Sequence, residues 1–274
     1  LRLSRGLGDV YKRQDQKLAT IVNGIDVILT GHTHDAIPKA IRINETLLLS
    51  SGSHGKYLGR IDLKVNNGKV VETSSNLIPI FSDVIPPDKE ISNLINKVRF
   101  PFEKECNRVI GETETLLYRR GNFNGSWDDV ICDTIIQERD TEISLSPGFR
   151  WGTSILPGQK ITIDDIYSQT AMNYPEVYRT EMTGKMIKEL LEDVCDNIFN
   201  PDPFFQQGGD MVRVGGLTYT CSPKNEIGKR ISNLRMVSTD KPLEASKKYI
   251  VGGWGSINPN VDGPPIYRLS LIHI

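Results

Sequence analysis

Apolar residues recur along the chain with two spacings, and the first of these predicts strands in the N-terminal third. An apolar run over residues 25–29, interrupted by Asp26, follows the turn signal Asn23-Gly24 and predicts a strand that is buried on both faces. The segments GRIDLKV and KVVETSS alternate in polarity and flank Asn66, Asn67 and Gly68, which is typical of a hairpin. We therefore expect a strand-rich unit that ends near residue 84.

Helical spacing appears next. Ile91, Leu94, Ile95 and Val98 recur at i, i+3, i+4 and i+7, which predicts an amphipathic helix. Pro87 suits the first turn of such a helix, because proline lacks the amide that this turn leaves unused. We expect this helix to link two domains.

Two more helices are expected in the second half. Ser126, with Asp129 three residues later, has the pattern of a reciprocal cap in front of the segment VICDTIIQE. Thr183 precedes GKMIKELLEDVCDNIF and is the expected N-cap of the other helix. Helices and strands are mixed without a strict β-α-β alternation, so the expected fold class is α+β.

Length and composition are those of an ordinary globular protein. A chain of 274 residues is long enough for one or two domains, and two are favoured. Hydrophobic residues make up 38% and charged residues 24%, and the formal net charge of −1 offers no electrostatic case for a nucleic-acid or membrane-surface partner. No apolar run approaches the ~20 residues of a membrane span.

The four cysteines, Cys106, Cys132, Cys195 and Cys221, are far apart in sequence and form no CxxC pair. This spacing argues against a zinc ribbon and against a thioredoxin-type motif. Scattered buried thiols are the favoured interpretation, and disulfides are the alternative. Cysteine usage therefore does not identify a cellular compartment.

The two ends of the chain differ from the rest. The stretch LRLSRGLGDVYKRQ at 1–14 has no apolar core of a signal peptide, and LSLIHI at 269–274 follows no turn or cap. Both resemble translated sequencing-adapter sequence, with a native disordered terminus as the alternative. We expect the genuine protein to be an internal fragment, with part of one domain at 15–84, a linker helix at 85–105 and a second domain at 106–268.

Two histidines flank one threonine in DVILTGHTHD, directly behind the predicted buried strand. Side chains at i and i+2 of such a segment can share one cavity, and two neutral imidazoles suit Zn, Mn or Fe. His32 and His34 are therefore candidate metal ligands, and Asp35 is a candidate to orient one ring from behind. A pair of surface loop histidines is the alternative. His54 is interpreted as a polar residue at a strand start rather than a ligand.

The same stretch resembles the last metal-binding motif of the calcineurin-like metallophosphoesterases, in the form used by the 5′-nucleotidase family. SGSHGKYLGRIDL resembles the strand pair that follows this motif, and EMTGKMIKELLE resembles the C-terminal substrate domain. The resemblance covers nearly all of residues 15–268. It implies the C-terminal part of an αββα sandwich, followed by a 5′-nucleotidase-type α/β substrate domain.

By this resemblance, His32 and His34 each bind one ion of a dinuclear centre of the kind that activates water in two-metal hydrolysis. The family's other ligands precede this motif: an Asp-x-His, a second Asp, an Asn with the catalytic His, and a further His. None of them is present in this sequence. No catalytic residue is therefore assigned, and this chain alone is expected to be inactive.

Two further segments, LSPGFRWGTSILPG and NIFNPDPFFQQGGDMVRVGG, resemble the SoxB-type thiosulfohydrolases of bacterial sulfur oxidation, and the GGDGY-like segment typical of nucleotidases is absent. The resemblance implies a periplasmic hydrolase with two Mn ions, or Zn ions, that releases sulfate from a cysteine S-thiosulfonate on a SoxYZ-type carrier. Because arginine presents a planar fork to such tetrahedral anions, Arg150 and Arg213 are candidate substrate contacts. Asp210 is a candidate to position Arg213, and Trp254 to line a channel.

Alternatives stay open for these residues. Arg150 fits a solvated surface position, Arg213 fits an interdomain salt bridge, and both Trp151 and Trp254 fit core packing. For the chain as a whole, one alternative is a 5′-nucleotidase or another periplasmic phosphoesterase. Another is a metal-free protein that uses the fold to dock a carrier.

Overall fold

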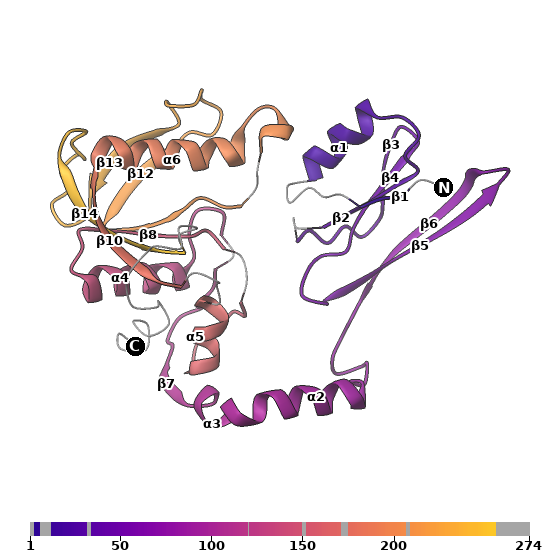
Figure 1. The fold of residues 1–274 in the computed structure, drawn as a ribbon, viewed down its shortest axis with the longest axis horizontal. Helices are drawn as coiled ribbons and strands as arrows, with labels where there is room; N and C mark the ends of the chain where they lie inside the picture. The colour runs from indigo at the N-terminus through magenta and orange to yellow at the C-terminus, as the bar shows by residue number, and fades with distance from the viewer. Residues whose placement is uncertain are drawn as a thin grey trace. The chain divides into compact units, whose positions relative to one another are not determined.

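A computed structural model describes residues 3–5, 12–31, 34–119, 121–149, 152–170, 175–206 and 209–255 of the chain. The chain divides into two compact units, one of Leu1–Ile95 with Asn200–Gly208 and the other of Asn96–Phe199 with Gly209–Ile274 (Figure 1). Each unit has its own sheet and its own buried clusters. Within the described ranges, no helix is both long and apolar enough to span a membrane.

The first unit layers a helix, a sheet and a hairpin. Its elements are β1 (Leu3–Arg5), α1 (Lys12–Ile21), β2 (Val27–Thr30), β3 (Ile41–Ile43), β4 (Thr46–Ser50), β5 (Tyr57–Asn66) and β6 (Lys69–Pro79). The sheet has the order β1-β2-β4-β3, and β2 runs parallel to both of its neighbours. Ala19 of α1 packs on Ile28 and Leu48 on one face, and Ile61 of the hairpin packs on Val27 on the other.

Local sequence signals account for much of this unit. The predicted buried strand is present as β2, where Val27 and Ile28 are fully buried. The predicted hairpin is present as β5 and β6, joined through Asn67 at φ 48° and Gly68 at φ 75°. Two successive positive φ angles are what a two-residue hairpin turn needs, and Asn-Gly adopts them readily. The hairpin is confirmed. The strand is confirmed as an element, but β2 covers Val27–Thr30 and its Leu29 is 42% exposed rather than buried.

Part of the N-terminal stretch is ordered secondary structure. Strand β1 pairs in parallel with β2, with Leu3 opposite Val27, and α1 begins at Lys12. Both elements include residues of 1–14, the segment that resembles adapter sequence. Pairing geometry carries no information on a segment's origin, so that interpretation stays a prediction. Residues 269–274 lie outside the described part of the chain.

The segment Asn200–Gly208 belongs to the first unit, although it lies between two segments of the second. The Lys17 Nζ of α1 lies 2.6 Å from Asp202 Oδ1 and 4.5 Å from the centroid of the Phe204 ring. This segment includes the short helix η2 (Pro203–Phe205). The compact units therefore differ from a second domain that is continuous over 106–268.

The expected linker helix is α2 (Lys89–Arg99), followed by η1 (Phe100–Phe102) and α3 (Glu103–Cys106). Asp88 caps it, because its carboxylate accepts a hydrogen bond from the Ile91 amide at 2.9 Å. Pro87 therefore precedes the cap, and its predicted place in the first turn is wrong. The apolar stripe of the helix is half or more exposed, at 55%, 55%, 50% and 61% for Ile91, Leu94, Ile95 and Val98.

The second unit is built on a mixed four-stranded sheet with one helix on each face. Its elements are β7 (Val109–Glu112), α4 (Ser126–Arg139), β8 (Ile143–Ser146), β9 (Lys160–Thr162), α5 (Ile163–Thr170), β10 (Val177–Thr183), α6 (Gly184–Phe199), β11 (Arg213–Gly215), β12 (Leu217–Cys221), β13 (Ile231–Met236) and β14 (Lys248–Trp254). The sheet order is β10-β14-β8-β11, in which only β14 and β8 are parallel. This mixture of helices and strands confirms the expected fold class.

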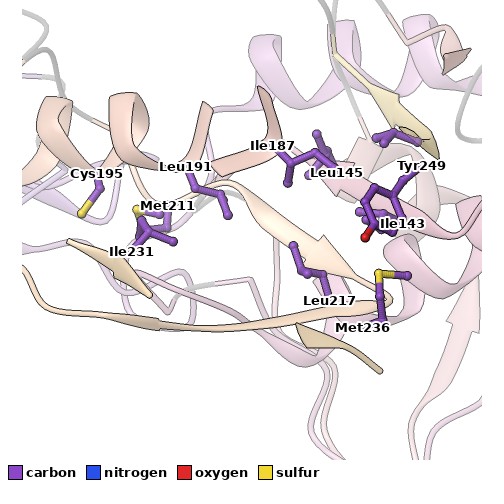
Figure 2. Close-up of a cluster of buried hydrophobic side chains, with 11 residues drawn as sticks. Ile143, Leu145, Ile187, Leu191, Cys195, Met211, Leu217, Ile231, Met236 and Tyr249 are labelled. Atoms are coloured by element: carbon purple, nitrogen blue, oxygen red, sulfur yellow. The ribbon is translucent and has the colours of Figure 1, made fainter. Parts of the chain in front are cut away.

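Strand β14 shows how the sheet separates two layers of core. Tyr249 and Val251 join the large cluster under α6, which includes Leu191 (Figure 2). Trp254, at the end of the same strand, packs instead with Ile131 of α4. Because side chains alternate along a strand, one strand serves both faces, and α4 and α6 lie on opposite sides of the sheet (Figure 1).

The two predicted helix caps have different outcomes. The Thr183 hydroxyl accepts a hydrogen bond from the Met186 amide at 3.2 Å, which confirms it as the cap of α6. Ser126 does not cap α4, since Gly125 is the N-cap and makes no side-chain cap bond. The Ser126 hydroxyl instead donates to the Leu116 carbonyl at 2.5 Å. Because the Ser126 hydroxyl bonds to the Leu116 carbonyl and not to an amide of the first turn of α4, the predicted reciprocal cap is wrong.

Candidate functional site

Two histidine-bearing loops meet at one edge of the first unit's sheet. Strands β2 and β4 are parallel neighbours, so the loops behind them start at the same edge, where open sheets place ligands. His34 follows β2 and His54 follows β4, and their ring centroids are 5.8 Å apart with the rings edge to face. His54 was not predicted as a ligand from the sequence, whereas the structure places it beside the predicted ligand His34.

The backbone holds both histidines in an uncommon conformation. His34 and His54 each have φ at 58°, in the left-handed region that side-chain-bearing residues seldom adopt. The Asp35 carbonyl accepts hydrogen bonds from the Ser50 hydroxyl at 2.6 Å and from the Gly52 amide at 2.8 Å. These bonds join the two loops directly behind the rings. Such backbone conformations gather at functional sites when the surroundings determine them.

The described residues do not complete a metal site. His32 lies outside them, and they contain no group of three or more His, Cys, Asp or Glu side chains arranged to hold an ion. Imidazole is a suitable donor for a transition metal, but two rings leave most of the coordination unfilled. We therefore assign no reaction step to a metal. The roles of His32, His34 and Asp35 as ligands and ligand support stay predictions.

Asp15 is a buried carboxylate near the same strand. It lies in the first turn of α1, and only 6% of it is exposed. Burial raises the pKa of the Asp15 carboxyl, and a neighbouring hydroxyl on Thr30, the last residue of β2, acts in the opposite direction. Buried carboxylates with a raised pKa are frequent at functional sites. Asp15 was not predicted from the sequence, because no linear signal connects α1 with the end of β2.

A second cluster lies at one edge of the second unit's sheet. The parallel strands β8 and β14 end there at Ser146 and Trp254, and the antiparallel strand β11 begins there at Arg213. Arg213 is the register partner of Ser146, and the Trp254 indole donates a hydrogen bond to the Ser146 hydroxyl at 2.8 Å. The fold thus brings together two of the residues predicted to contact substrate.

Two sequence motifs that are far apart in the chain pack against each other at this edge. A side chain at Gly148, in SPGFRWG, would collide with the Met211 carbonyl oxygen and the Asp210 Cβ, in GGDMVRVGG. Glycine is therefore required for the close approach of the two backbones. Arg150 and Trp151, in the same loop, lie outside the described residues. The predicted substrate role of Arg150 stays a prediction.

Asp128 of α4 joins two arginines inside the second unit. Its Oδ1 accepts from Arg119 Nε at 2.7 Å, and its Oδ2 lies 3.1 Å from Arg213 Nε. All three side chains have no exposed surface. Burial raises the pKa of Asp128 and lowers that of Arg119, while the opposite charges facing them act the other way. Desolvated charges of this kind are stable only as a paired group.

The Arg119 guanidinium has hydrogen-bond or ring contacts on every side, and Arg119 was not predicted as a site residue from the sequence. Its Nη1 donates to the Gln169 carbonyl at 2.7 Å and its Nη2 to the Pro147 carbonyl at 2.9 Å. Its guanidinium carbon also lies 5.7 Å from the centroid of the Phe149 ring and 5.9 Å from that of Trp254. Trp254 therefore packs in the core and supports a buried cation. A channel-lining role for it stays a prediction.

Arg213 pairs within its own unit. Its Nη2 donates to the Gly121 carbonyl at 2.5 Å and lies 3.6 Å from Asp210 Oδ2. Two guanidiniums face two carboxylates in this network, so the network is formally neutral. Among the described residues, Arg213 Nη1 has no hydrogen-bond partner. Asp210 lies where the positioning hypothesis requires, and substrate contact stays a prediction for both residues.

Comparison with known proteins identifies the family. The family model of the 5′-nucleotidase C-terminal domain matches residues 109–265. The chain belongs to this family. Its second unit is therefore a 5′-nucleotidase-type C-terminal domain.

Solved structures extend the likeness to the first unit. The sulfate thiohydrolase SoxB of Thermus thermophilus is 33% identical, with a TM-score of 0.89, over 95% of this chain and 49% of that chain. A 5′-nucleotidase precursor, also from Thermus thermophilus, is 18% identical, with a TM-score of 0.77, over 95% of this chain and 58% of that one. The second likeness is one of fold alone.

Curated relatives are more distant in sequence. The trifunctional nucleotide phosphoesterase YfkN of Bacillus subtilis is 25% identical over 276 residues, which are 91% of this chain and 18% of that protein. A snake venom 5′-nucleotidase of Macrovipera lebetinus is 25% identical over 281 residues, 87% of this chain and 67% of that protein. The chain thus spans about half of the SoxB chain and less than a fifth of YfkN.

Proposed function

We propose that this chain is part of a SoxB-type thiosulfohydrolase, which releases sulfate from a cysteine S-thiosulfonate on a SoxYZ-type carrier protein in the periplasm. The observation that carries the proposal is the similarity to SoxB, at 33% identity and a TM-score of 0.89. At equal coverage of this chain, the Thermus 5′-nucleotidase precursor has 18% sequence identity and a TM-score of 0.77. The absence of a GGDGY-like segment supports the same choice.

The second unit supplies the proposed anion contacts. A terminal sulfonate is a tetrahedral oxyanion, and a guanidinium presents two parallel N–H donors to such a group. We assign this contact to Arg150 and Arg213. Asp210 positions Arg213, and Trp254 lines the proposed substrate channel. Arg213 Nη1 lacks a hydrogen-bond partner among the described residues and is buried, so the proposed contact requires this atom to become accessible when substrate binds. Asp128 and Arg119 hold the Arg213 side chain in place.

The first unit supplies part of a proposed metal site. We propose two divalent ions, Mn or alternatively Zn, with His32 and His34 among their ligands and Asp35 behind one ring. When bound, such ions activate water and stabilise anionic oxygens. Among the described residues, the neighbouring imidazoles of His34 and His54 are not joined by a third metal-ligating side chain. Further ligands are therefore needed for the activity.

An assay on full-length protein containing this chain tests the function. Thiosulfonated carrier and nucleoside monophosphates are offered in parallel, and released sulfate and phosphate are measured. We expect sulfate release, and an R213K variant is expected to lose about a hundredfold in kcat/KM, since lysine cannot present the fork. R235K, at an exposed arginine, is the matched control and should retain activity. Nucleotide hydrolysis without sulfate release contradicts the proposal.

The second candidate function is a 5′-nucleotidase or a related phosphoesterase. It is favoured by the family match over residues 109–265 and by the names of the curated relatives. The same parallel assay separates it from the thiosulfohydrolase. A third candidate, a metal-free carrier-docking protein, is tested by equilibrium dialysis and elemental analysis of the full-length protein, where absence of Mn and Zn favours docking.

A further inference from the structure

Two cysteines that are far apart in sequence meet in the core of the second unit. The Sγ atoms of Cys195, on α6, and Cys221, at the end of β12, are 3.4 Å apart, and both thiols are free. Cys195 is fully buried beside Ile231 and Met211 (Figure 2). Cys221 is half-buried and packs against the same cluster.

Hydrogen bonds on both sides hold this pair in place. Glu192, Cys195 and Asp196 lie at i, i+3 and i+4 of α6 and therefore share one face of the helix. The Glu192 carboxylate accepts from the Ile231 amide at 2.8 Å, and Asp196 forms an ion pair with Arg230 at 2.5 Å. The start of β13 is thus bound to α6 directly before and after the cysteine.

Cys221 shares this frame and can be reached from outside. It is the register partner of Ile231, so the same bonds position its backbone. A cavity of about 550 Å³ is lined by Cys221 together with Phe123, Leu217 and Tyr219. A reagent in this cavity meets Cys221 first, because Cys195 is enclosed. Burial also raises the pKa of the Cys195 thiol to about 12, so Cys195 is not the thiolate that attacks first.

We infer that Cys195 and Cys221 form a disulfide when the protein meets a disulfide oxidant, such as oxidised glutathione or a dithiol–disulfide exchange protein. A disulfide is about 2.05 Å long, so the sulfurs must approach by roughly 1.4 Å to bond. This site is separate from the proposed sulfonate chemistry and does not depend on it.

The exchange proceeds in two balanced steps. The Cys221 thiolate attacks one sulfur of the oxidant, which forms a mixed disulfide and releases the first thiolate. The Cys195 thiol then attacks Cys221 Sγ and expels the second thiolate, which takes up the Cys195 proton. Two electrons pass from the protein thiols to the oxidant, which leaves as two thiols. The product links α6 to the β12–β13 ribbon across a sequence separation of 26 residues.

Oxidation of the complete chain tests the inference. The folded protein is incubated with excess oxidised glutathione, the thiols are counted after denaturation, and the peptides are mapped by mass spectrometry. We expect four thiols before and two after, a loss of two hydrogens in mass, and one cross-linked peptide pair carrying Cys195 and Cys221. The thermal midpoint should rise by roughly 5–10 °C and return on reduction.

Matched variants distinguish this bond from other oxidation. C221S abolishes the cross-link and the midpoint shift, whereas C106S and C132S retain both. The C221S variant changes only a half-buried thiol, and its circular dichroism verifies folding. Three outcomes overturn the inference: four countable thiols after oxidation, a stable glutathione adduct on Cys221, or a cross-link that involves Cys106 or Cys132.

Discussion

Arg119 Nε lies 2.7 Å from Asp128 Oδ1, and neither side chain has any exposed surface. This ion pair ties α4 to the loop behind β8, because Arg119 also donates to the Pro147 carbonyl at 2.9 Å. Arg213 occupies the other carboxylate oxygen, at 3.1 Å. One carboxylate therefore organises the sheet edge at which the candidate substrate residues of the second unit gather.

Replacing this carboxylate is expected to destabilise the second unit strongly. D128N keeps the side-chain volume but leaves the buried Arg119 without its counter-ion and the buried Arg213 with Asp210 alone. Removing one partner of a buried ion pair costs about 3–5 kcal/mol in the free energy of unfolding. Urea unfolding followed by tryptophan fluorescence measures the loss, since Trp127 and Trp254 both lie in this unit's core. D129N, at the exposed neighbouring aspartate, is the control, and an equal loss in both variants would refute a special role for Asp128.

A methyl group at Gly148 is expected to force apart the two motifs that resemble SoxB-type enzymes. In G148A the new Cβ meets the Met211 carbonyl oxygen, and overpacking of this kind costs about 1–3 kcal/mol. G31A is the control, because a Cβ at Gly31 meets nothing within 4 Å and its φ is not positive. Urea unfolding compares the two. A G148A variant no less stable than G31A would show that the backbone contact is unimportant.

His54 is expected to support metal binding at His34 in full-length protein, as part of the proposed metal centre. Loss of a neighbouring group that orients a ligand typically lowers metal affinity about 10- to 100-fold. H54A should therefore release Mn or Zn at lower chelator concentration than the unchanged protein, as measured by elemental analysis after graded dialysis. K56A, in the same turn, serves as control. Equal retention by H54A and K56A would remove His54 from the site.

Ionisation of Asp15 is expected to cost stability in the first unit. Its pKa is raised in the folded state, so its favourable contribution is complete below its ordinary value of 3.8 and is lost as pH rises through the raised value. D15N should abolish this loss and protect α1 better at pH 7. Hydrogen exchange of α1 peptides, corrected for intrinsic rates, measures it. D62N, at an exposed aspartate, is the control, and unchanged protection in D15N would contradict the expectation.

The polypeptide as it stands is expected to show no repeated turnover of thiosulfonate or nucleotide. Its described part holds two neighbouring imidazoles and no third metal-ligating group beside them. Sulfate or phosphate release in excess of one equivalent per chain, with added Mn or Zn, would contradict this prediction.

Several elements were predictable because their signals are local. Asn67 and Gly68 encode the hairpin turn in the residues that adopt it, and Thr183 caps α6 with its own hydroxyl. Ser126 carries an equally good local signal, yet the Leu116 carbonyl, ten residues away, takes its hydroxyl. A cap pattern therefore holds only where no tertiary acceptor competes for the same group.

The sequence by itself determined the strand and helix pattern, the turn chemistry, and the motifs that pointed to the family now matched over residues 109–265. Tertiary structure alone decided which distant residues meet: His54 with His34, Arg119 with Asp128, and the thiols of Cys195 and Cys221. The physical reason is the sequence distance over which each kind of interaction is made. Turns and caps are satisfied within a few residues, whereas buried charges, rings and thiols take their partners from whichever strand or helix the fold places beside them.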